Sequence, residues 1–568
     1  MPGNTLLKGA ETLAERPALD RLQTASSGPA GLVTEIQDDG YVTGKSLYMV
    51  LLGILLSVLL IAIDQTIVAN ALPLIASAFN ALSQLAWVPT SFLLTQASFL
   101  LIYGQLTLLF PSKWVFIWAL VLFEIGSLLS GVATSVNFLI FARAFQGVGA
   151  AGVFVLPISM VAELVPLKNR AMCFSAFGGV FAISSIIVYI NLPLSIPTFI
   201  AVFLCTKAKP PLGLAGQKPT SVETADPSKK SLLVVTWLSL KGSCQKMTNL
   251  DWIGAILVLG FTTCLGLALQ WGGNTKPWNS GGVIATFVVF GVLVILFVLW
   301  QRYKGDKALL PLSLFRRLTI VGCCICAFST RMAFFTAVYY LPLYFQVVKG
   351  HSAIKSGIDL LPLVLAVVST FAAGSFIVSK TGRVWHILLL GPLVGAICFG
   401  LLNTMDEDTG WGKLIGLQIG VGIGVGCTLQ NAVLAAQAAV HKELVSQASA
   451  LVTFSSFIGG ILGVSIAGTI FQNKLASGLL QFAPEAPYAL LRHSIEAIAT
   501  LPANQKAGAI HAYVEALKLV FVAMGVSANV ICSLSALMIE NTNLKKMSPV
   551  QAGEGEKEDE LDADNGMA

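Results

Sequence analysis

Four ionisable side chains interrupt the apolar runs of this sequence and are its first candidates for chemistry: Asp64, Glu124, Arg143 and Arg331. Charged groups are costly inside a bilayer, so those that occur there usually mark a path for ions or substrates. A carboxylate in apolar surroundings takes up a proton more readily than one in water, and a neighbouring guanidinium changes that affinity. We therefore expect Asp64, Glu124 and Arg143 to take part in proton coupling.

Each of the four also has a structural interpretation. Asp64 and Glu124 could form hydrogen bonds that hold neighbouring helices together, and Arg143 could serve helix packing alone. For Arg331 we expect a structural or interfacial role rather than contact with an anionic substrate. The small residues that follow Arg143 allow a neighbouring backbone to approach closely. This helix-packing motif consists of Gln146, Gly147, Gly149 and Gly152.

The elements that carry these groups are membrane helices. Of the 568 residues, 55% are hydrophobic and 11% are charged, whereas soluble globular chains carry about 25% charged residues. A membrane helix needs roughly 20 apolar residues, and the alternating strands of about ten residues that build membrane barrels do not occur. The ordinary apolar runs are Ser46–Val68, Ala86–Phe110, Trp114–Ala133, Phe138–Val165, Trp252–Trp271, Gly281–Trp300, Ile320–Phe345, Ile354–Val378, Trp385–Leu402, Trp411–Ala439, Ser449–Phe471 and Leu517–Met538.

A further apolar block, Ala171–Thr206, has an abnormal length. As one helix its 36 residues would extend about 54 Å, against a hydrocarbon core of roughly 30 Å. A single crossing would also place the lysines that follow outside the cell, against the positive-inside rule. We expect a cramped hairpin or a broken pair of helices, with the break near Tyr189 to Pro197.

Polar segments divide the chain into parts. Lysines and arginines gather in alternate loops, which places those loops and both termini in the cytoplasm. The expected parts are a disordered N-terminus (1–45), an N-terminal helical bundle (46–206, truncated at 171–206), a cytoplasmic linker (207–250), two linker transmembrane helices (251–301), a C-terminal helical bundle (302–540) and an acidic cytoplasmic tail (541–568).

The motifs around Asp64 and Arg143 resemble those of the major facilitator superfamily, specifically the fungal fourteen-helix drug:proton antiporters that include mycotoxin efflux pumps. The fourth-helix pattern R-x-x-Q-G-x-G-A-A matches from Arg143 to Ala151. The resemblance extends from about Ser46 to Met538. The first-helix pattern matches at Asp64, Thr66, Ile67, Val68, Leu72 and Pro73.

This resemblance implies an all-α polytopic membrane protein with the major facilitator fold. Two six-helix bundles would be joined by two extra central helices, with helices 5 and 6 truncated here. It implies proton-coupled efflux of small hydrophobic organic molecules such as toxins, secondary metabolites or drugs. The protein would be a monomer in the plasma membrane, or in a vacuolar or vesicle membrane, and neither an enzyme nor a nucleic-acid binder. No cofactor or metal is expected.

Aromatic and amide side chains in these helices are of the kind that line cavities for amphipathic ligands. For any one of them, packing between helices is the simpler explanation. These candidates for the substrate cavity are Trp87, Gln270, Tyr339, Tyr340, Gln346 and Gln430.

Two segments depart from the family pattern. The loop after the second helix is usually G-x-L-(S/T)-D-x-x-G-R-K, but here Leu108 replaces the acid, and Pro111 and Ser112 replace the glycine and arginine. This puts the charge-relay gate of that loop in question. The fifth-helix antiporter signature G-P-x-x-G-G is also absent from the stretch that begins at Phe181, which suggests a chain that transports poorly.

The sequence also bears on other functions. An ATP-driven pump is excluded because the run from Gly40 to Ser46 has three residues between its glycines, where the phosphate-binding loop requires four. The cysteines at 323, 324 and 326 indicate helix packing rather than a metal or redox site, since no partners occur at zinc spacing. Proton-coupled uptake of a nutrient, such as a siderophore or an amino acid, and a transport-impaired truncated family member remain as alternatives.

Overall fold

The protein is a polytopic bundle of membrane-spanning helices, seen here in a computed structural model. The structure describes residues 48–61, 64, 87–166, 169–170, 172–174, 176, 250–272, 276–484, 501–541 and 543. Within these residues, eleven helices are long and apolar enough to cross a membrane. The same residues contain no strand, and the one extended pairing is an isolated bridge between Gly272 and Lys276. The expected all-α membrane fold is therefore confirmed.

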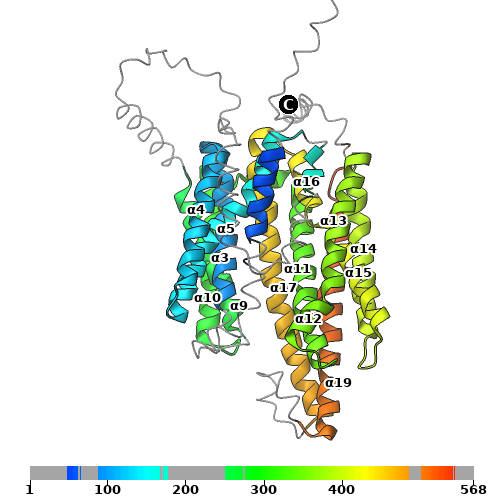
Figure 1. The fold of residues 1–568 in the computed structure, drawn as a ribbon. Coiled ribbons are helices and arrows are strands. Elements are labelled where there is room, and N and C mark those ends of the chain that lie inside the picture. Colours follow the sequence, from blue (N-terminus) through cyan, green and yellow to red (C-terminus); the bar gives the residue numbers. More distant parts are fainter. Residues whose placement is uncertain are drawn as a thin grey trace, which may run out of the picture. The chain divides into compact units, whose positions relative to one another are not determined.

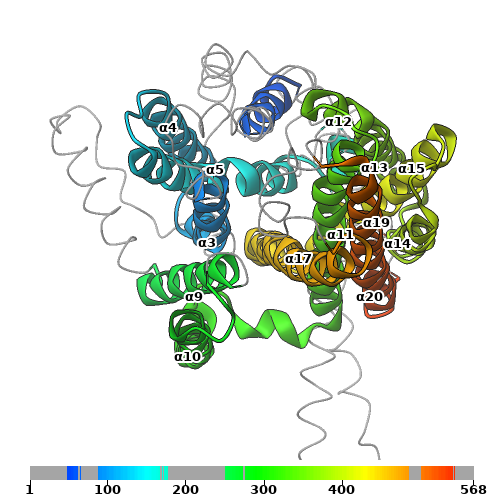
Figure 2. The ribbon, with the colours of Figure 1, turned by 90° about the horizontal axis from the view of Figure 1, so that it is seen from below.

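The helices before residue 165 form the N-terminal bundle. In it, α5 packs against both α3 and α4, as the blue and cyan ribbons of Figure 2 show. Ser135 caps α5 by accepting a hydrogen bond from the Phe138 backbone N–H at 3.3 Å, which satisfies an otherwise unpaired donor. The elements are a helix at Tyr48–Ile61, α3 (Trp87–Leu109), α4 (Ser112–Gly131) and α5 (Val136–Leu164).

Two further helices, α9 (Trp252–Trp271) and α10 (Gly281–Lys304), pack against each other, and α9 also packs against α3. Their place beside α3 is visible in Figures 1 and 2. A hydrogen bond of 2.5 Å between the hydroxyls of Ser98 and Thr262 joins α3 to α9. Only Val283, Phe297 and Gln301 of α10 are buried, so this apolar helix presents its surface to lipid.

The remaining helices form the C-terminal bundle. The π-helical turn Phe521–Val526 connects its last two helices, and short 3-10 turns occur at Gly305–Lys307, Leu312–Arg316, Leu402–Thr404 and Lys442–Leu444. The helices are α11 (Leu318–Val347), α12 (Ala353–Asp359), α13 (Leu361–Thr381), α14 (Trp385–Leu401), α15 (Trp411–Thr428), α16 (Asn431–Ala438), α17 (Val445–Phe482), α19 (Ala503–Val520) and α20 (Ser527–Ala536).

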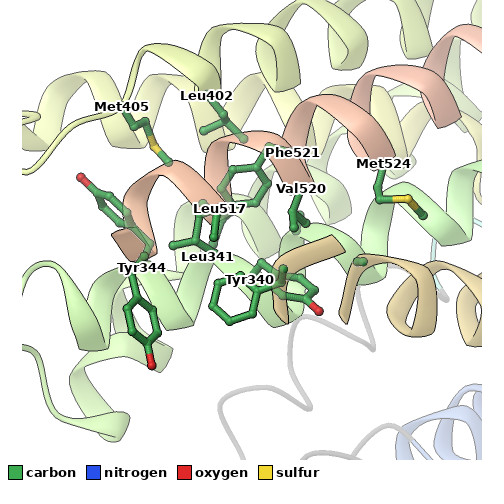
Figure 3. Close-up of a cluster of buried hydrophobic side chains, with 14 of the residues drawn as sticks. Tyr340, Leu341, Tyr344, Leu402, Met405, Leu517, Val520, Phe521 and Met524 are labelled. Carbon is green, nitrogen blue, oxygen red and sulfur yellow. The ribbon is translucent and has the colours of Figure 1, made fainter. Parts of the chain in front are cut away.

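An apolar core holds the C-terminal bundle together (Figure 3). Tyr340, Leu341 and Tyr344 of α11 lie in one cluster with Leu517 and Phe521 from the last membrane crossing. Burying a large apolar side chain contributes about 1.5–3 kcal/mol relative to exposure in water. Inside a bilayer that gain is absent, because lipid tails are as apolar as leucine, so close packing must stabilise this cluster.

The helix α17 is much longer than the run Ser449–Phe471 predicts, and the last crossing begins at Ala503 rather than Leu517. At 1.5 Å per residue the 38 residues of α17 extend about 57 Å. The polar residues Gln472 to Lys474 end the apolar run, but Leu475 and Leu479 keep the four-residue spacing and stay buried against α19. Both helices therefore continue beyond the roughly 30 Å hydrocarbon core.

The basic loops meet at one end of the bundles, which we call the arginine end. There Gln105 of α3 donates to the Lys307 carbonyl at 3.3 Å, and Arg317 donates to the Ala439 carbonyl at 2.5 Å. The first bond joins the end of α3 to the turn after α10, and the second joins the start of α11 to the end of α16. The opposite end carries the acidic loop Asp406 to Asp408.

Several sequence expectations lie outside the described residues. They concern the N-terminus (1–45), most of the block Ala171–Thr206 with its break near Tyr189 to Pro197, the linker (207–249) and the tail beyond residue 543. The truncation of helices 5 and 6 and the domain boundaries therefore stay predictions.

Candidate functional site

A buried ion pair between Asp64 and Arg143 forms the centre of the N-terminal bundle. Arg143 Nη1 donates to both carboxylate oxygens of Asp64, at 3.0 Å and 2.9 Å. Gln146 completes the site: its Oε1 accepts from Arg143 Nη1 at 2.6 Å, and its Nε2 donates to Asp64 Oδ1 at 2.9 Å. The three residues are 6%, 3% and 0% exposed. They form a closed ring of charge-assisted hydrogen bonds that carries no net charge.

Two helices and an aromatic ring position this site. Arg143 and Gln146 are three residues apart on α5, a spacing that puts both side chains on one helix face. The Phe92 ring of α3 lies 4.3 Å from the Arg143 guanidinium carbon, close enough for a cation–π contact. Asp64 belongs to the apolar run that begins with the helix Tyr48–Ile61. The Nε of Arg143 is buried without a hydrogen-bond partner among the described residues.

Glycines let α3 and α4 press directly against this part of α5. A methyl group placed on Gly147 would overlap the Thr95 hydroxyl and the Phe92 carbonyl, and one on Gly149 would overlap the Phe123 backbone. A methyl group on Gly152 would overlap Ala119 and the Tyr103 ring. This close approach of backbones fixes the depth and rotation of α5, and thereby the position of Arg143.

Protonation of Asp64 would disturb this arrangement. Protonating Asp64 would remove the only counter-charge that the structure shows for Arg143. An unpaired charge in a buried site costs several kcal/mol, so the guanidinium would have to move or find another partner. A site of this kind can therefore convert binding of a proton into a shift between two helix arrangements.

The other sequence candidates are distributed over several helices. Glu124 is half-buried on α4, and Trp87 is half-buried at the start of α3. Tyr340 lies in the C-terminal core with its ring centroid 5.7 Å from that of Phe471, a placement that favours packing over substrate contact. Tyr339, one residue earlier on α11, is 52% exposed.

Two of the three amide candidates, Gln346 and Gln430, lie at helix junctions. Gln346 Nε2 is 3.5 Å from the Ser356 hydroxyl, a weak contact between α11 and α12. Gln430 is half-buried at the junction that precedes α16. The Gln270 side chain lies outside the described part of the chain.

A hydroxyl cluster that the sequence did not reveal joins the two bundles near the arginine end. Thr107 of α3 donates to the Ser446 hydroxyl of α17 at 2.6 Å, and Ser159 of α5 lies 3.1 Å from the same oxygen. A methyl group on Gly104 would be 2.7 Å from the Ala450 methyl carbon, so α3 and α17 are in direct contact here. Single hydroxyls in apolar runs give no sequence signal.

A second link between the bundles starts at Arg170, which follows α5. It is 6% exposed, and it donates to the Ala162 carbonyl at 2.6 Å and to Gln437 Oε1 at 3.3 Å. Gln437 in turn donates to the Ser449 hydroxyl at 3.0 Å. The segment after α5 is thereby tied to α16 and α17.

The loop between α3 and α4, which departs from the family pattern, is held in place by hydrogen bonds to other segments. Gln105 Oε1 accepts from the Asp251 backbone N–H at 3.2 Å. The buried Asp251 carboxylate accepts from the Leu309 N–H at 3.0 Å and from Trp300 Nε1 at 2.7 Å. Ser112 donates to the Glu163 carboxylate. These bonds fix the loop to α5, α9 and α10 without the acid and arginine that the family pattern has there.

We expect Ser446→Ala to loosen the contact between the bundles. The change removes two hydrogen bonds, which contribute about 0.6 kcal/mol each between membrane helices. A reporter cysteine that replaces Ala450 should then react with a maleimide several-fold faster than the same cysteine in a protein that retains Ser446. Ser477→Ala is the matched control, since the Ser477 hydroxyl donates to the Lys474 carbonyl within α17 and, among the described residues, makes no bond to another helix. An unchanged reaction rate would show that the cluster does not hold the interface.

The sequence of this chain is similar to a family model and to named transport proteins. The family model of the Major Facilitator Superfamily matches residues 54–205 and 245–464. The MFS-type efflux pump MFS1 of Trichophyton rubrum is 34% identical over 532 residues, which cover 90% of this chain and 95% of that protein. Efflux pump aflT of Aspergillus parasiticus is 32% identical over 456 residues, covering 77% and 84%.

A similar fold occurs among solved structures. A bacterial homolog of the human lysosomal transporter Spinster superposes with a TM-score of 0.50 and 16% sequence identity. The match covers 88% of this chain and 98% of that one. At this identity the likeness concerns the fold alone.

Proposed function

The chain belongs to the Major Facilitator Superfamily, and on that premise we propose that it exports small hydrophobic organic molecules in exchange for protons. It is a multi-pass membrane transporter and not an enzyme. Export is supported by relatives over most of the chain that are named efflux pumps. The single observation that carries the proton coupling is the buried ring of Asp64, Arg143 and Gln146.

The coupling follows because Asp64 and Arg143 neutralise each other's charge. When Asp64 is ionised, Arg143 is neutralised and the helices that carry them are held together. When Asp64 takes up a proton, the guanidinium loses its counter-charge, and the arrangement seen here becomes unfavourable. Alternating access is a movement of one bundle against the other around a central site, and this change of charge would drive that movement.

The hydroxyl cluster at Ser446 would act at the same step. We infer that the arginine end faces the cytoplasm. The contacts of Ser446 with Thr107 and Ser159 then stabilise a state in which the bundles touch on the cytoplasmic side. Each 100 mV of membrane potential supplies about 2.3 kcal/mol per charge moved, enough to break such a contact in every cycle. We place the protein in the plasma membrane as a monomer.

Cells that express the protein should accumulate less of an apolar aromatic dye than cells without it. The gradient supplies the energy, so a protonophore should restore accumulation, whereas depletion of ATP at a constant gradient should leave it low. Dye fluorescence per cell measures the effect. Export that survives collapse of the gradient would rule out the antiporter, and increased accumulation would indicate uptake.

A further inference from the structure

Arg331 is a second arginine within a membrane span, and it lies near the middle of α11. It is the fourteenth residue of that helix, so at 1.5 Å per residue it lies about 20 Å along the axis from the first residue. Its Nε donates to the Ser456 hydroxyl of α17 at 3.0 Å. The rings of Phe335 and Phe457 lie 5.8 Å and 5.4 Å from its guanidinium carbon.

No acid neutralises this arginine in the part of the chain that the structure describes. Its one described polar partner is the hydroxyl of Ser456, whereas Arg143 has Asp64. The apolar runs 65–86 and 177–206, which lie outside the described part, contain no Asp or Glu. Asp64 is already bonded to Arg143. An intramembrane arginine normally pairs with an anion or with backbone carbonyls, and the described residues supply neither to Arg331.

The guanidinium lies close to the boundary between the bundles. The Phe457 ring, which contacts Arg331, also meets the Phe154 ring of α5 edge to face, with centroids 5.5 Å apart. Gly460 lets α17 approach closely: a methyl group there would be 2.6 Å from the Phe335 ring and 2.9 Å from Arg331 Cγ. Figure 2 shows α11 and α17 side by side.

A polar and aromatic stripe continues from Arg331 along α11. Phe335 and Tyr339 follow at intervals of four residues, which places all three on one face of the helix. The rings of Phe335 and Tyr339 meet edge to face at 6.0 Å, and Tyr339 is exposed. This face offers a cation, a hydroxyl and flat apolar surfaces to one ligand.

The sequence alone favoured a structural role for Arg331, but with these contacts in view we propose that Arg331 and Ser456 bind the acidic group of the transported molecule. The ligand is an organic anion with a flat apolar body, whose carboxylate or acidic enolate meets the planar guanidinium. Its body lies against Phe335, Phe457 and Tyr339. This inference rests on the proposed function and narrows its substrate class.

The inference has an electrical consequence. Export of a neutral molecule against one entering proton moves one positive charge inward per cycle. Export of a monovalent anion against one proton moves two, because an anion that leaves equals a positive charge that enters. An inside-negative potential should therefore accelerate transport of an acid more than transport of its neutral ester.

The test uses a matched pair of probes, pyrenebutyrate and its methyl ester, with the purified full-length chain. Equilibrium binding should favour the acid in the parent protein. Arg331→Gln should weaken binding of the acid at least about tenfold, leave the ester unchanged, and abolish the preference. Arg331→Lys should retain part of it, because the charge survives without the planar fork. Arg383→Gln, a change of an exposed loop arginine, is the control.

The outcomes separate this inference from the function on which it rests. An acid-to-ester ratio that is the same in the parent and in both Arg331 variants would overturn the anion site. If size-exclusion chromatography shows that the Arg331→Gln variant is misfolded, the Ser456→Ala variant is tested in its place. That variant should also bind the acid more weakly than the parent does and bind the ester equally well. Proton-driven transport of the ester alone would also refute the site while sustaining export. Absence of proton-driven transport of either probe would refute the proposed function instead.

Discussion

Proteoliposomes that contain the Asp64→Asn variant should export no organic probe above the protein-free background when a pH gradient is imposed. Asparagine has nearly the same shape as aspartate and can still accept a hydrogen bond from Gln146 Nε2, which lies 2.9 Å from Oδ1 in the parent. It cannot carry a proton. Like protonation, the change leaves Arg143 without its counter-charge, so the variant should fold with reduced stability and still bind the probe, while the coupled step fails.

The measurement combines equilibrium binding with transport under the gradient, each on the same preparation. Asp408→Asn, a change in the exposed acidic loop at the opposite end, serves as the matched control and should export at the parental rate. If Asp64→Asn exported at that rate too, the coupling role would have to move, and Glu124→Gln would be the next variant to examine.

Replacement of Arg143 by alanine should abolish transport and also lower the stability of the protein. The variant leaves the Asp64 carboxylate buried, 8% exposed in its side chain, without its cation. Breaking a buried pair in this way costs about 3–5 kcal/mol. Arg143→Lys should restore little transport, because lysine lacks the planar guanidinium that contacts the Phe92 ring.

The double variant separates the loss of the ion pair from the cost of burying an unpaired charge. In the pair Asp64→Asn with Arg143→Ala no charge remains to be buried, so its thermal unfolding temperature should lie above that of Arg143→Ala alone. The difference from the sum of the single effects measures the coupling between the two side chains. Strictly additive effects would mean that the ion pair contributes nothing to the folded state.

Much of this architecture could be predicted because apolar runs and glycine spacing are local signals. The span Trp252–Trp271 agrees with α9 at both ends, and the small residues after Arg143 mark the face of α5 that α3 and α4 contact. The bond from Gln146 to Asp64 could not be predicted, because it depends on how two helices are rotated against each other. No spacing along one helix contains that information.

The predicted end of α17 and the predicted start of the last crossing were wrong for a related reason. The polar stretch Gln472 to Lys474 ended the predicted span, but packing of Leu475 and Leu479 against α19 maintains the helix to Phe482. The links through Ser446 and Arg170 were missed because each partner lies in a different bundle. Tertiary contacts decided these features, and residue patterns within one segment do not record them.

Simultaneous recording of probe and proton movement shows whether the protein exchanges one for the other. Proteoliposomes loaded with an aromatic probe, with a pH-sensitive dye in the lumen and no ATP, are transferred to an acidic medium. Coupled exchange predicts that the probe leaves while the lumen acidifies faster than in protein-free vesicles, and that neither occurs with Asp64→Asn. Probe efflux at the same rate without accompanying acidification, or after a protonophore has removed the gradient, would contradict the account.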